Sequence, residues 1–156
     1  MEAYDWLAGR GIRQWLVLLP FEEFQKRTSE GRNYGLFDGP DLLAVAALSK
    51  FTDDHWVDLI GAEPRWWLGA LAIRSSLRGR GIGRQTVAHA RAAAATAGAA
   101  ELYLDCVEGA LPQYYVGLGF ERCAAKTITY RSGNAFPMVL MRATAPDPAA
   151  EPNSKR

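Results

Sequence analysis

The sequence predicts an α/β domain, because segments typical of strands alternate with segments typical of helices along its 156 residues. The apolar run from Trp66 to Ile73 is typical of a strand, and a turn rich in glycine and arginine, Leu77 to Arg84, follows it. An alanine-rich helix is expected next, over Gly81 to Ala97, with Gly98 as its C-terminal stop. A strand, a glycine-rich turn and a helix start in this order are typical of a phosphate-binding site.

The remaining elements follow from the spacing of apolar residues and from turn residues. Before the alanine-rich helix we expect helices over residues 2–9 and 20–30 and strands over 34–37, 42–49 and 65–74. The turn Asp38-Gly39-Pro40-Asp41 joins the first two strands as a hairpin. Residues 51–63 are ambiguous, and Trp56 to Ile60 could form a short strand. After the helix we expect a strand over 101–107, a helix over 111–118 and closing strands over 120–131 and 136–142.

The residues of the glycine-rich turn have the chemistry that a phosphate group needs. Glycine lets the backbone approach a ligand closely, and the first amides of a helix have no partner within the helix. Arg78, Arg80 and Arg84 add full positive charges. A Walker loop is excluded, because Arg84-Gln85 stands where lysine and serine would be, and a dinucleotide fingerprint would need a glycine that is missing. Ordinary turn glycines with solvated arginines are the alternative.

Two segments carry motifs in a recognisable order. Arg78 to Gly83 has the pattern Gln/Arg-x-x-Gly-x-Gly/Ala, and Tyr114 to Phe120 has an aromatic residue, a tyrosine, three residues and then Gly-Phe. Together they resemble the GNAT superfamily of acyl-CoA-dependent N-acetyltransferases, over residues 42–142. The resemblance implies a mixed, mostly antiparallel sheet flanked by helices. It also implies acetyl-CoA as co-substrate, direct attack by an amine and no metal.

The resemblance also implies roles for particular residues. The loop that holds the pyrophosphate of acetyl-CoA would consist of Arg78, Gly79, Arg80, Gly81, Ile82, Gly83 and Arg84. Backbone amides of Leu71, Ala72 and Ile73, where their strand splays or bulges, would polarise the thioester carbonyl. Tyr115 would be the general acid that protonates the leaving thiolate, whereas Tyr114, its neighbour on the helix, is expected to pack.

The general base is the least predictable part of the site. The strand that ends at Ile73 offers no acid where many relatives carry a glutamate. We single out His55, whose ordinary pKa suits a base, and Asp105 and Glu108 as base or acceptor-side residues. Glu108 stands where relatives often have an asparagine that binds pantetheine. Loss of the amine proton to solvent is the alternative.

Composition limits the remaining possibilities. The formal net charge of +1 argues against a nucleic-acid partner, and no apolar run has the length of a membrane span. The N-terminus lacks a basic region typical of a signal peptide, so we expect a cytoplasmic protein. The acceptor is expected to be a small-molecule amine or a peptide amine. A non-catalytic acyl-CoA-binding regulatory module is the alternative function.

The two ends of the chain carry the last expectations. A single domain is expected over residues 1–142, and residues 143–156, which hold three prolines and few large apolar residues, are expected to form a disordered tail. The family usually begins with a strand, yet only six residues precede Leu7, so the first strand is missing or atypical. An unpaired sheet edge would favour a homodimer.

Overall fold

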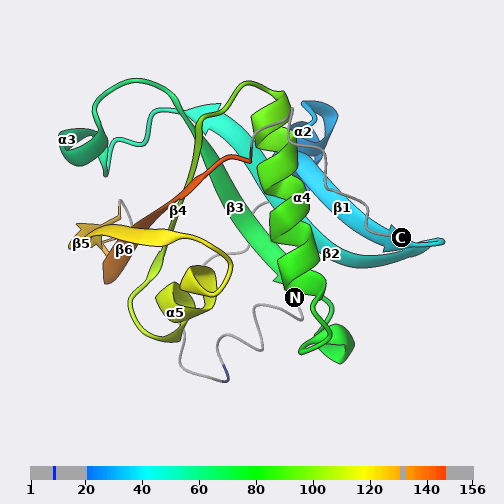
Figure 1. Cartoon of the computed structure of the whole chain (residues 1–156). Coiled ribbons are helices and arrows are strands. Elements are labelled where there is room, and N and C mark those ends of the chain that lie inside the picture. The colour runs from blue at the N-terminus through cyan, green and yellow to red at the C-terminus, as the bar shows by residue number, and fades with distance from the viewer. Residues whose placement is uncertain (1–8, 10–20, 131–132, 147–156) are drawn as a thin grey trace.

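A six-stranded sheet in the order β1-β2-β3-β4-β6-β5 organises the computed structural model, which describes residues 9, 21–130 and 133–146 (Figure 1). Its strands are β1 (Asn33–Asp38), β2 (Asp41–Phe51), β3 (Arg65–Ile73), β4 (Glu101–Val107), β5 (Glu121–Thr129) and β6 (Ala135–Thr144). β3 and β4 are parallel, and all other neighbouring strands are antiparallel. The predicted mixed, mostly antiparallel sheet is therefore confirmed.

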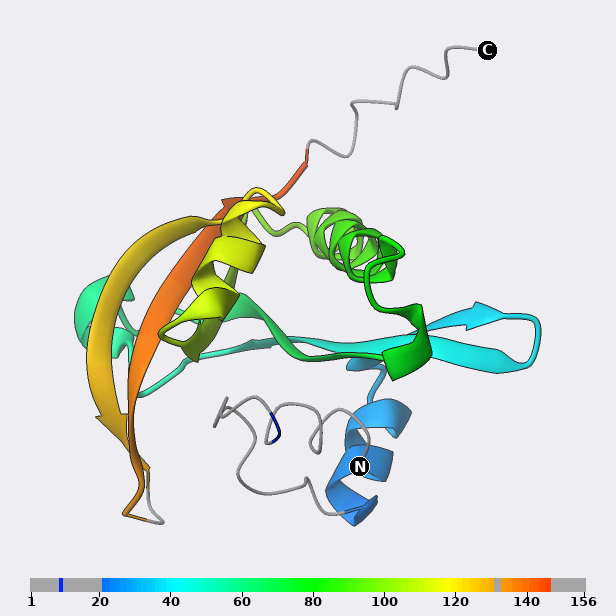
Figure 2. The same ribbon diagram turned by 90° about the horizontal axis from the view of Figure 1, so that it is seen from below.

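Helices cover both faces of the sheet. They are α2 (Phe21–Ser29), α3 (Val57–Ile60), α4 (Ile82–Thr96) and α5 (Ala110–Val116), with a short 3-10 turn, η1, at Ser75–Leu77. Figure 2 shows α4 and α5 on one side of the sheet and α2 on the other. Val87, Ala90 and Ala94 form the buried face of α4, and their small size lets the helix lie close to the strands.

The sheet separates two groups of buried side chains. The first lies with α4 and α5 and includes Leu104, Cys106 and Tyr115. The second includes Trp56 and Tyr103. Successive residues of a strand point to opposite faces, and β4 therefore contributes side chains to both groups.

β3 is irregular in its pairing with both of its neighbours. In the described part of the chain its parallel pairing with β4 is short and consists of Trp66 with Leu102 and Trp67 with Tyr103. Further along, Val45 and Ala47 of β2 pair with Ala72 and Gly69, so one residue of β2 faces two of β3. This is a β-bulge, and Ala70 within it has a φ of 50°, a left-handed conformation that residues other than glycine rarely adopt.

Three segments differ from the sequence-based expectations. Trp56 to Ile60 does not form a strand, because the amides of Leu59 and Ile60 both bond to the carbonyl of Trp56 and close the single turn of α3. β6 continues to Thr144, two residues beyond the predicted domain end, because Ala143 is buried in the core. Residues 147–156 and the expected helix over 2–9, except Gly9, lie outside the described residues. The question of a first strand concerns residues 1–20 and therefore also lies outside them, again except for Gly9.

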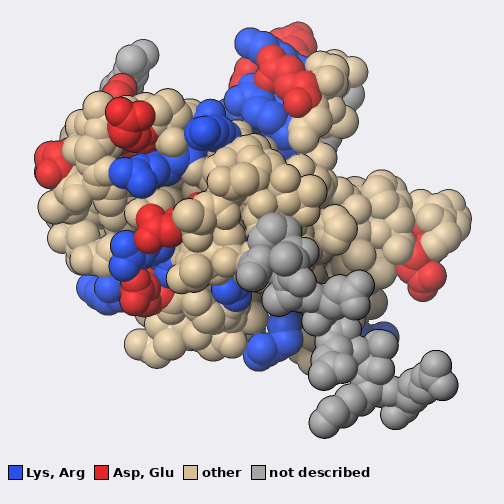
Figure 3. All heavy atoms as spheres, turned by 45° about the horizontal axis from the view of Figure 1, so that its top comes forward, with Lys and Arg blue, Asp and Glu red and all other residues tan. Residues whose placement is uncertain are grey.

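Charged side chains of both signs are interspersed on the face drawn in Figure 3. One group lies at the end of the sheet, where Arg142 of β6 pairs with Glu101 of β4 at 3.0 Å and with Glu121 of β5. These exposed pairs tie neighbouring strands together and leave no broad field of one sign on this face.

Candidate active site

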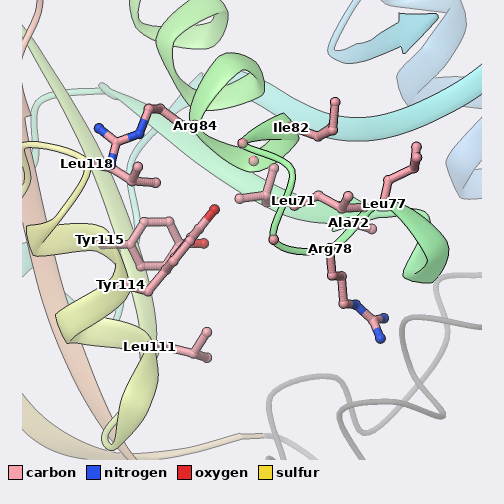
Figure 4. Close-up of a pocket in the computed structure, with 14 residues that line it drawn as sticks. Leu71, Ala72, Leu77, Arg78, Ile82, Arg84, Leu111, Tyr114, Tyr115 and Leu118 are labelled. Carbon is pink, nitrogen blue, oxygen red and sulfur yellow. The ribbon is translucent and has the colours of Figure 1, made fainter. Parts of the chain in front are cut away.

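A cavity of about 440 Å³ lies where the C-terminal end of β3, the glycine-rich turn and α5 meet. Its lining comes from residues 71–73, residues 77–79 and 81–84, and Leu111, Tyr114, Tyr115 and Leu118. Figure 4 shows the two tyrosines reaching into the cavity from α5, with Leu71 and Ala72 across from them. The structure thus brings together most of the residues that the two sequence motifs indicate.

Glycine is required in the turn for two different reasons. Gly79 and Gly81 have φ values of 77° and 79°, in the region where a side chain is strained. Gly81 is also the residue that precedes the first turn of α4. Gly83 has ordinary helical geometry, but a Cβ atom there would lie 2.2 Å from the Tyr114 hydroxyl and 2.7 Å from Ile73 Cδ1. Position 83 therefore requires glycine because Tyr114 and Ile73 fill the space that a side chain would need.

The first turn of α4 offers unpaired amides to the cavity. Its first backbone hydrogen bond runs from the Gln85 amide to the Gly81 carbonyl, at 3.1 Å. The amides of Ile82, Gly83 and Arg84 come before that bond and lie at the positive end of the helix dipole. This arrangement is suited to an anion with several oxygen atoms, such as a pyrophosphate.

The three arginines of the turn are placed differently from one another. Arg78 and Arg84 line the cavity, and Arg80 is exposed and does not. In Figure 4 the Arg84 side chain lies beside Leu118, on the same side of the cavity as the two tyrosines, whereas that of Arg78 extends away from them. Arg84 is therefore the arginine whose charge acts most directly on the tyrosine side of the cavity.

The bulge in β3 turns part of that strand toward the cavity. Leu71, Ala72 and Ile73, which directly follow Ala70, line the cavity. A bulge interrupts the ladder of hydrogen bonds and can leave backbone donors available to a ligand. The expected bulge is present, and the amides of these three residues are the candidates to hold a carbonyl oxygen.

Tyr115 is almost fully buried but remains part of the cavity lining. Its side chain is 7% exposed and contacts the rings of Phe120 and Tyr114 edge-on, at centroid distances of 5.8 and 5.3 Å. Burial raises the pKa of Tyr115 above its ordinary value, and the negative charge of Asp105 acts in the same direction. The phenol therefore stays protonated at neutral pH and can serve as a hydrogen-bond donor.

Tyr114 does not pack into the core as expected from its position on the helix. It is 41% exposed and lines the same cavity as Tyr115. Adjacent residues of a helix point about 100° apart, which predicted that Tyr114 would point away from the site of Tyr115. That prediction was wrong, because the side chains of both residues line the cavity. Burial raises the pKa of Tyr114, and the nearby charge of Arg84 opposes that change.

Asp105 lies on the other face of β4. Its Oδ2 accepts a hydrogen bond from Trp56 Nε1 at 3.1 Å, and Trp56 itself is completely buried. Burial raises the pKa of the Asp105 carboxyl, the Trp56 hydrogen bond lowers it, and the charge of Asp53 adds to the increase. A carboxylate with a raised pKa is a stronger base than an exposed one, so Asp105 has the electrostatic character of a general base.

The two other candidate bases are held in different surroundings. His55 is exposed, and its ring meets Tyr130 edge-on at 5.3 Å. Glu108 receives two hydrogen bonds from the Arg122 guanidinium, one of them 2.8 Å long, and this pairing lowers the pKa of Glu108. Glu108 is therefore occupied by an ion pair, and a lowered pKa weakens it as a base. None of the three candidate bases lines the cavity, so the structure does not bring them into the space that the two motifs share.

A family model identifies the family to which the chain belongs. The model of the acetyltransferase (GNAT) family matches residues 1–120. The chain therefore belongs to the acetyltransferase (GNAT) family, whose members are acetyl-CoA-dependent N-acetyltransferases, and it is an enzyme of that class. The predicted resemblance is confirmed. No match was found among curated protein sequences.

Solved structures with this fold include three that illustrate its range. A GNAT-family acetyltransferase from Listeria monocytogenes is 18% identical, with a TM-score of 0.70 over 91% of this chain and 83% of that chain. The ribosomal-protein-alanine N-acetyltransferase of Brucella melitensis is 17% identical, with a TM-score of 0.66 over 91% and 90%. N-acetylglutamate synthase from Neisseria gonorrhoeae, in complex with coenzyme A and N-acetyl-glutamate, is 18% identical, with a TM-score of 0.64 over 92% and 31%.

No group of three or more His, Cys, Asp or Glu side chains in residues 9, 21–130 and 133–146 has an arrangement that could hold a metal ion. No helix in that part of the chain is long and apolar enough to cross a membrane.

Proposed function

We propose that the protein transfers an acetyl group from acetyl-CoA to a primary amine by direct attack, without a covalent enzyme intermediate. The observation that carries this proposal is the cavity itself. It joins the bare amides at the start of α4, the bulged backbone of β3 and the protonated hydroxyl of Tyr115 in one space. These are the groups that thioester aminolysis needs for binding, carbonyl polarisation and departure of the thiol.

The glycine-rich turn would bind the pyrophosphate of acetyl-CoA. The amides of Ile82, Gly83 and Arg84 supply directed donors, and the guanidinium groups of Arg78, Arg80 and Arg84 supply charge. Gly79 and Gly81 hold the turn in its left-handed conformations without strain. Binding at the turn would direct the acyl end of the substrate toward β3 and α5.

Amides of the bulged strand would stabilise the transition state. As the amine nitrogen attacks the carbonyl carbon, negative charge develops on the carbonyl oxygen. The backbone N–H groups of Leu71, Ala72 and Ile73 are the candidates to donate hydrogen bonds to that oxygen. Because the strand fixes these donors in advance, they need no rearrangement during the reaction.

Asp105 and Tyr115 would handle the two protons of the reaction. Asp105 does not line the cavity, so it would accept the proton of the attacking nitrogen through solvent water as the C–N bond forms. Tyr115 donates its hydroxyl proton to the sulfur as the C–S bond breaks, and solvent returns a proton from Asp105 to Tyr115. We favour Asp105 over His55 and Glu108, because the Asp105 carboxyl is buried beside Trp56, whereas His55 is exposed and Glu108 is paired with Arg122.

The acceptor class is a primary amine on a small molecule or a peptide. The names of the structural neighbours support both, since one acts on a ribosomal-protein alanine and another is an N-acetylglutamate synthase. Burial raises the pKa of Tyr130, and the negative charges of Asp105 and Asp53 act in the same direction. Negative charge on this face of the sheet would favour an amine that arrives as a cation.

Location and assembly are part of the same proposal. We place the protein in the cytoplasm, which supplies acetyl-CoA and keeps free thiols such as Cys106 and Cys123 reduced. A homodimer is proposed through an edge of the sheet, since β1 and β5 are the outer strands of the described part.

The proposal is tested by measuring thiol release from acetyl-CoA against a panel of amines. The panel contains amino acids, polyamines and short peptides with free N-termini, and acetylated products are identified by mass spectrometry. We expect amine-dependent thiol release with at least one acceptor class. Tight acetyl-CoA binding without turnover on any acceptor would instead favour the acyl-CoA-binding regulatory module.

A further inference from the structure

The Tyr114 hydroxyl occupies an unusual position at the start of α4. It lies so close to Gly83 that a Cβ atom on this residue would be 2.2 Å from the hydroxyl oxygen. Gly83 is the second residue of α4 and is buried, and its amide is one of the three that precede the first helical hydrogen bond. Figure 4 shows the Tyr114 ring extending from α5 toward this turn. A phenol from one helix thus meets the anion-binding end of another.

The hydroxyl has no protein partner among the described residues. The Tyr114 ring meets the Tyr115 ring edge-on, at 5.3 Å between centroids, and the positive charge of Arg84 acts on the Tyr114 hydroxyl. Burial keeps the phenol protonated by raising its pKa. A protonated, unpaired O–H group beside free backbone amides adds a donor of the same kind to the same space.

We propose that Tyr114 is a binding residue for the pyrophosphate of acetyl-CoA, donating a hydrogen bond from its hydroxyl beside the amides of Ile82, Gly83 and Arg84. This inference rests on the proposed acetyl-CoA site and extends it to a residue outside the glycine-rich turn. It also accounts for glycine at position 83. Alanine would place a methyl group against the hydroxyl and displace the donor from the site.

The test is a calorimetric titration with coenzyme A of the wild type, Tyr114→Phe, Gly83→Ala and the double variant. Tyr114→Phe should weaken binding roughly tenfold or more, the loss typical of one hydrogen bond to a charged group. Gly83→Ala should weaken binding in the wild-type background and less in the Tyr114→Phe background, since the Tyr114 oxygen is then absent and the methyl group meets only the flexible end of Ile73, 2.7 Å away. Tyr103→Phe is the control, because its hydroxyl bonds to Glu101 at 2.8 Å, away from the cavity.

Dephospho-coenzyme A, which keeps the pyrophosphate and lacks the 3′-phosphate, identifies the group that is bound. The Tyr114→Phe loss should be the same for both ligands, and a loss that disappears with dephospho-coenzyme A would overturn the assignment to the pyrophosphate. Unchanged or tighter binding by Tyr114→Phe would overturn the inference altogether. If the wild type itself does not bind coenzyme A, the proposed function fails instead, so the two failures are distinguishable.

Discussion

Asp105 and Tyr115 lie on opposite faces of β4, and burial together with the negative charge of Asp105 raises the pKa of Tyr115. Asp105 is fixed on its face by the buried Trp56, through a hydrogen bond of 3.1 Å. Tyr115 is fixed on the other face among the side chains that α4 and α5 cover, including Cys106. The proposed base and the proposed acid thus lie on opposite faces of the same strand, and of the two Tyr115 lines the cavity.

Tyr115→Phe removes the hydroxyl and keeps the ring that packs against Phe120. We expect kcat to fall on the order of 100-fold or more, while the Kd for acetyl-CoA stays nearly unchanged. The measurement is steady-state kinetics beside a calorimetric titration, with Tyr103→Phe as the matched tyrosine control. Wild-type kcat in the Tyr115→Phe variant, with chemistry shown to be rate-limiting, would mean that water protonates the thiolate.

Asp105→Asn should remove the proposed general base and raise the Tm of the protein at neutral pH. The asparagine Oδ1 can still accept the Trp56 hydrogen bond, so the packing is preserved. We expect kcat to fall by on the order of 100-fold or more, and the acidic limb of the wild-type pH profile to disappear. An unchanged pH profile in the variant would assign the base elsewhere.

The effect of Asp105→Asn on the stability of the fold depends on pH. Burial raises the pKa of Asp105 in the folded state above its ordinary value of 3.8. The stabilising contribution of the protonated carboxyl is complete below that value and is lost as pH rises through the raised pKa. The variant should therefore have a higher Tm than the wild type at pH 7, and the difference should shrink toward zero below about pH 4. A lower Tm at pH 7 would contradict the burial of this charge.

Glu108→Gln and His55→Ala should leave kcat within about twofold of the wild type, because Glu108 is held by Arg122, His55 is exposed and neither residue lines the cavity. Glu108 is an exposed partner of Arg122, and exposed ion pairs contribute little to stability. Kinetics of the two variants on one well-turned-over amine check this expectation. A large loss in His55→Ala that is confined to kcat would move the base from Asp105 to His55.

Truncations define the C-terminal end of the folded domain. Removal of everything after Arg142 deletes Ala143, which is 2% exposed, and the hydrogen bond from the Ala145 amide to the Ala100 carbonyl. We therefore expect a clearly lower Tm for this truncation in thermal unfolding. Removal of residues 147–156 alone should change Tm little, because their sequence offers few apolar side chains to bury. Equal Tm values for the two truncations would contradict the extended β6.

Most of the fold was predictable because its signals are local. The alanine-rich α4, ended by Gly98, and the alternation of strands from β3 to β6 follow from residue spacing and turn residues. Trp56 to Ile60 was ambiguous from the sequence, because its apolar residues do not share one face. Trp56 is completely buried, whereas Leu59 is 53% exposed. Burial of Trp56 against Asp105, a contact between residues 49 positions apart, decides the local structure there.

The glycine-rich turn was also predictable from local sequence, since Gly79 and Gly81 adopt the left-handed conformations that such a motif requires. The contact between Tyr114 and Gly83 was not, because it depends on how α5 is set against α4. Residue spacing also does not indicate that Arg122 forms an ion pair with Glu108, or that Trp56 donates a hydrogen bond to Asp105. Each of these is a contact between distant segments, which only the packed sheet brings together.

Whether the turn before α4 binds acetyl-CoA is decided by calorimetric titration of Gly81→Glu and of Gly98→Glu with acetyl-CoA. The two glycines have nearly equal φ values, 79° and 82°, and a Cβ at either meets no atom within 4 Å. The two substitutions therefore impose the same backbone strain at opposite ends of one helix. We predict that Gly81→Glu abolishes acetyl-CoA binding and that Gly98→Glu retains the wild-type Kd. Equal affinity of the wild type and Gly81→Glu would contradict the assignment of the site.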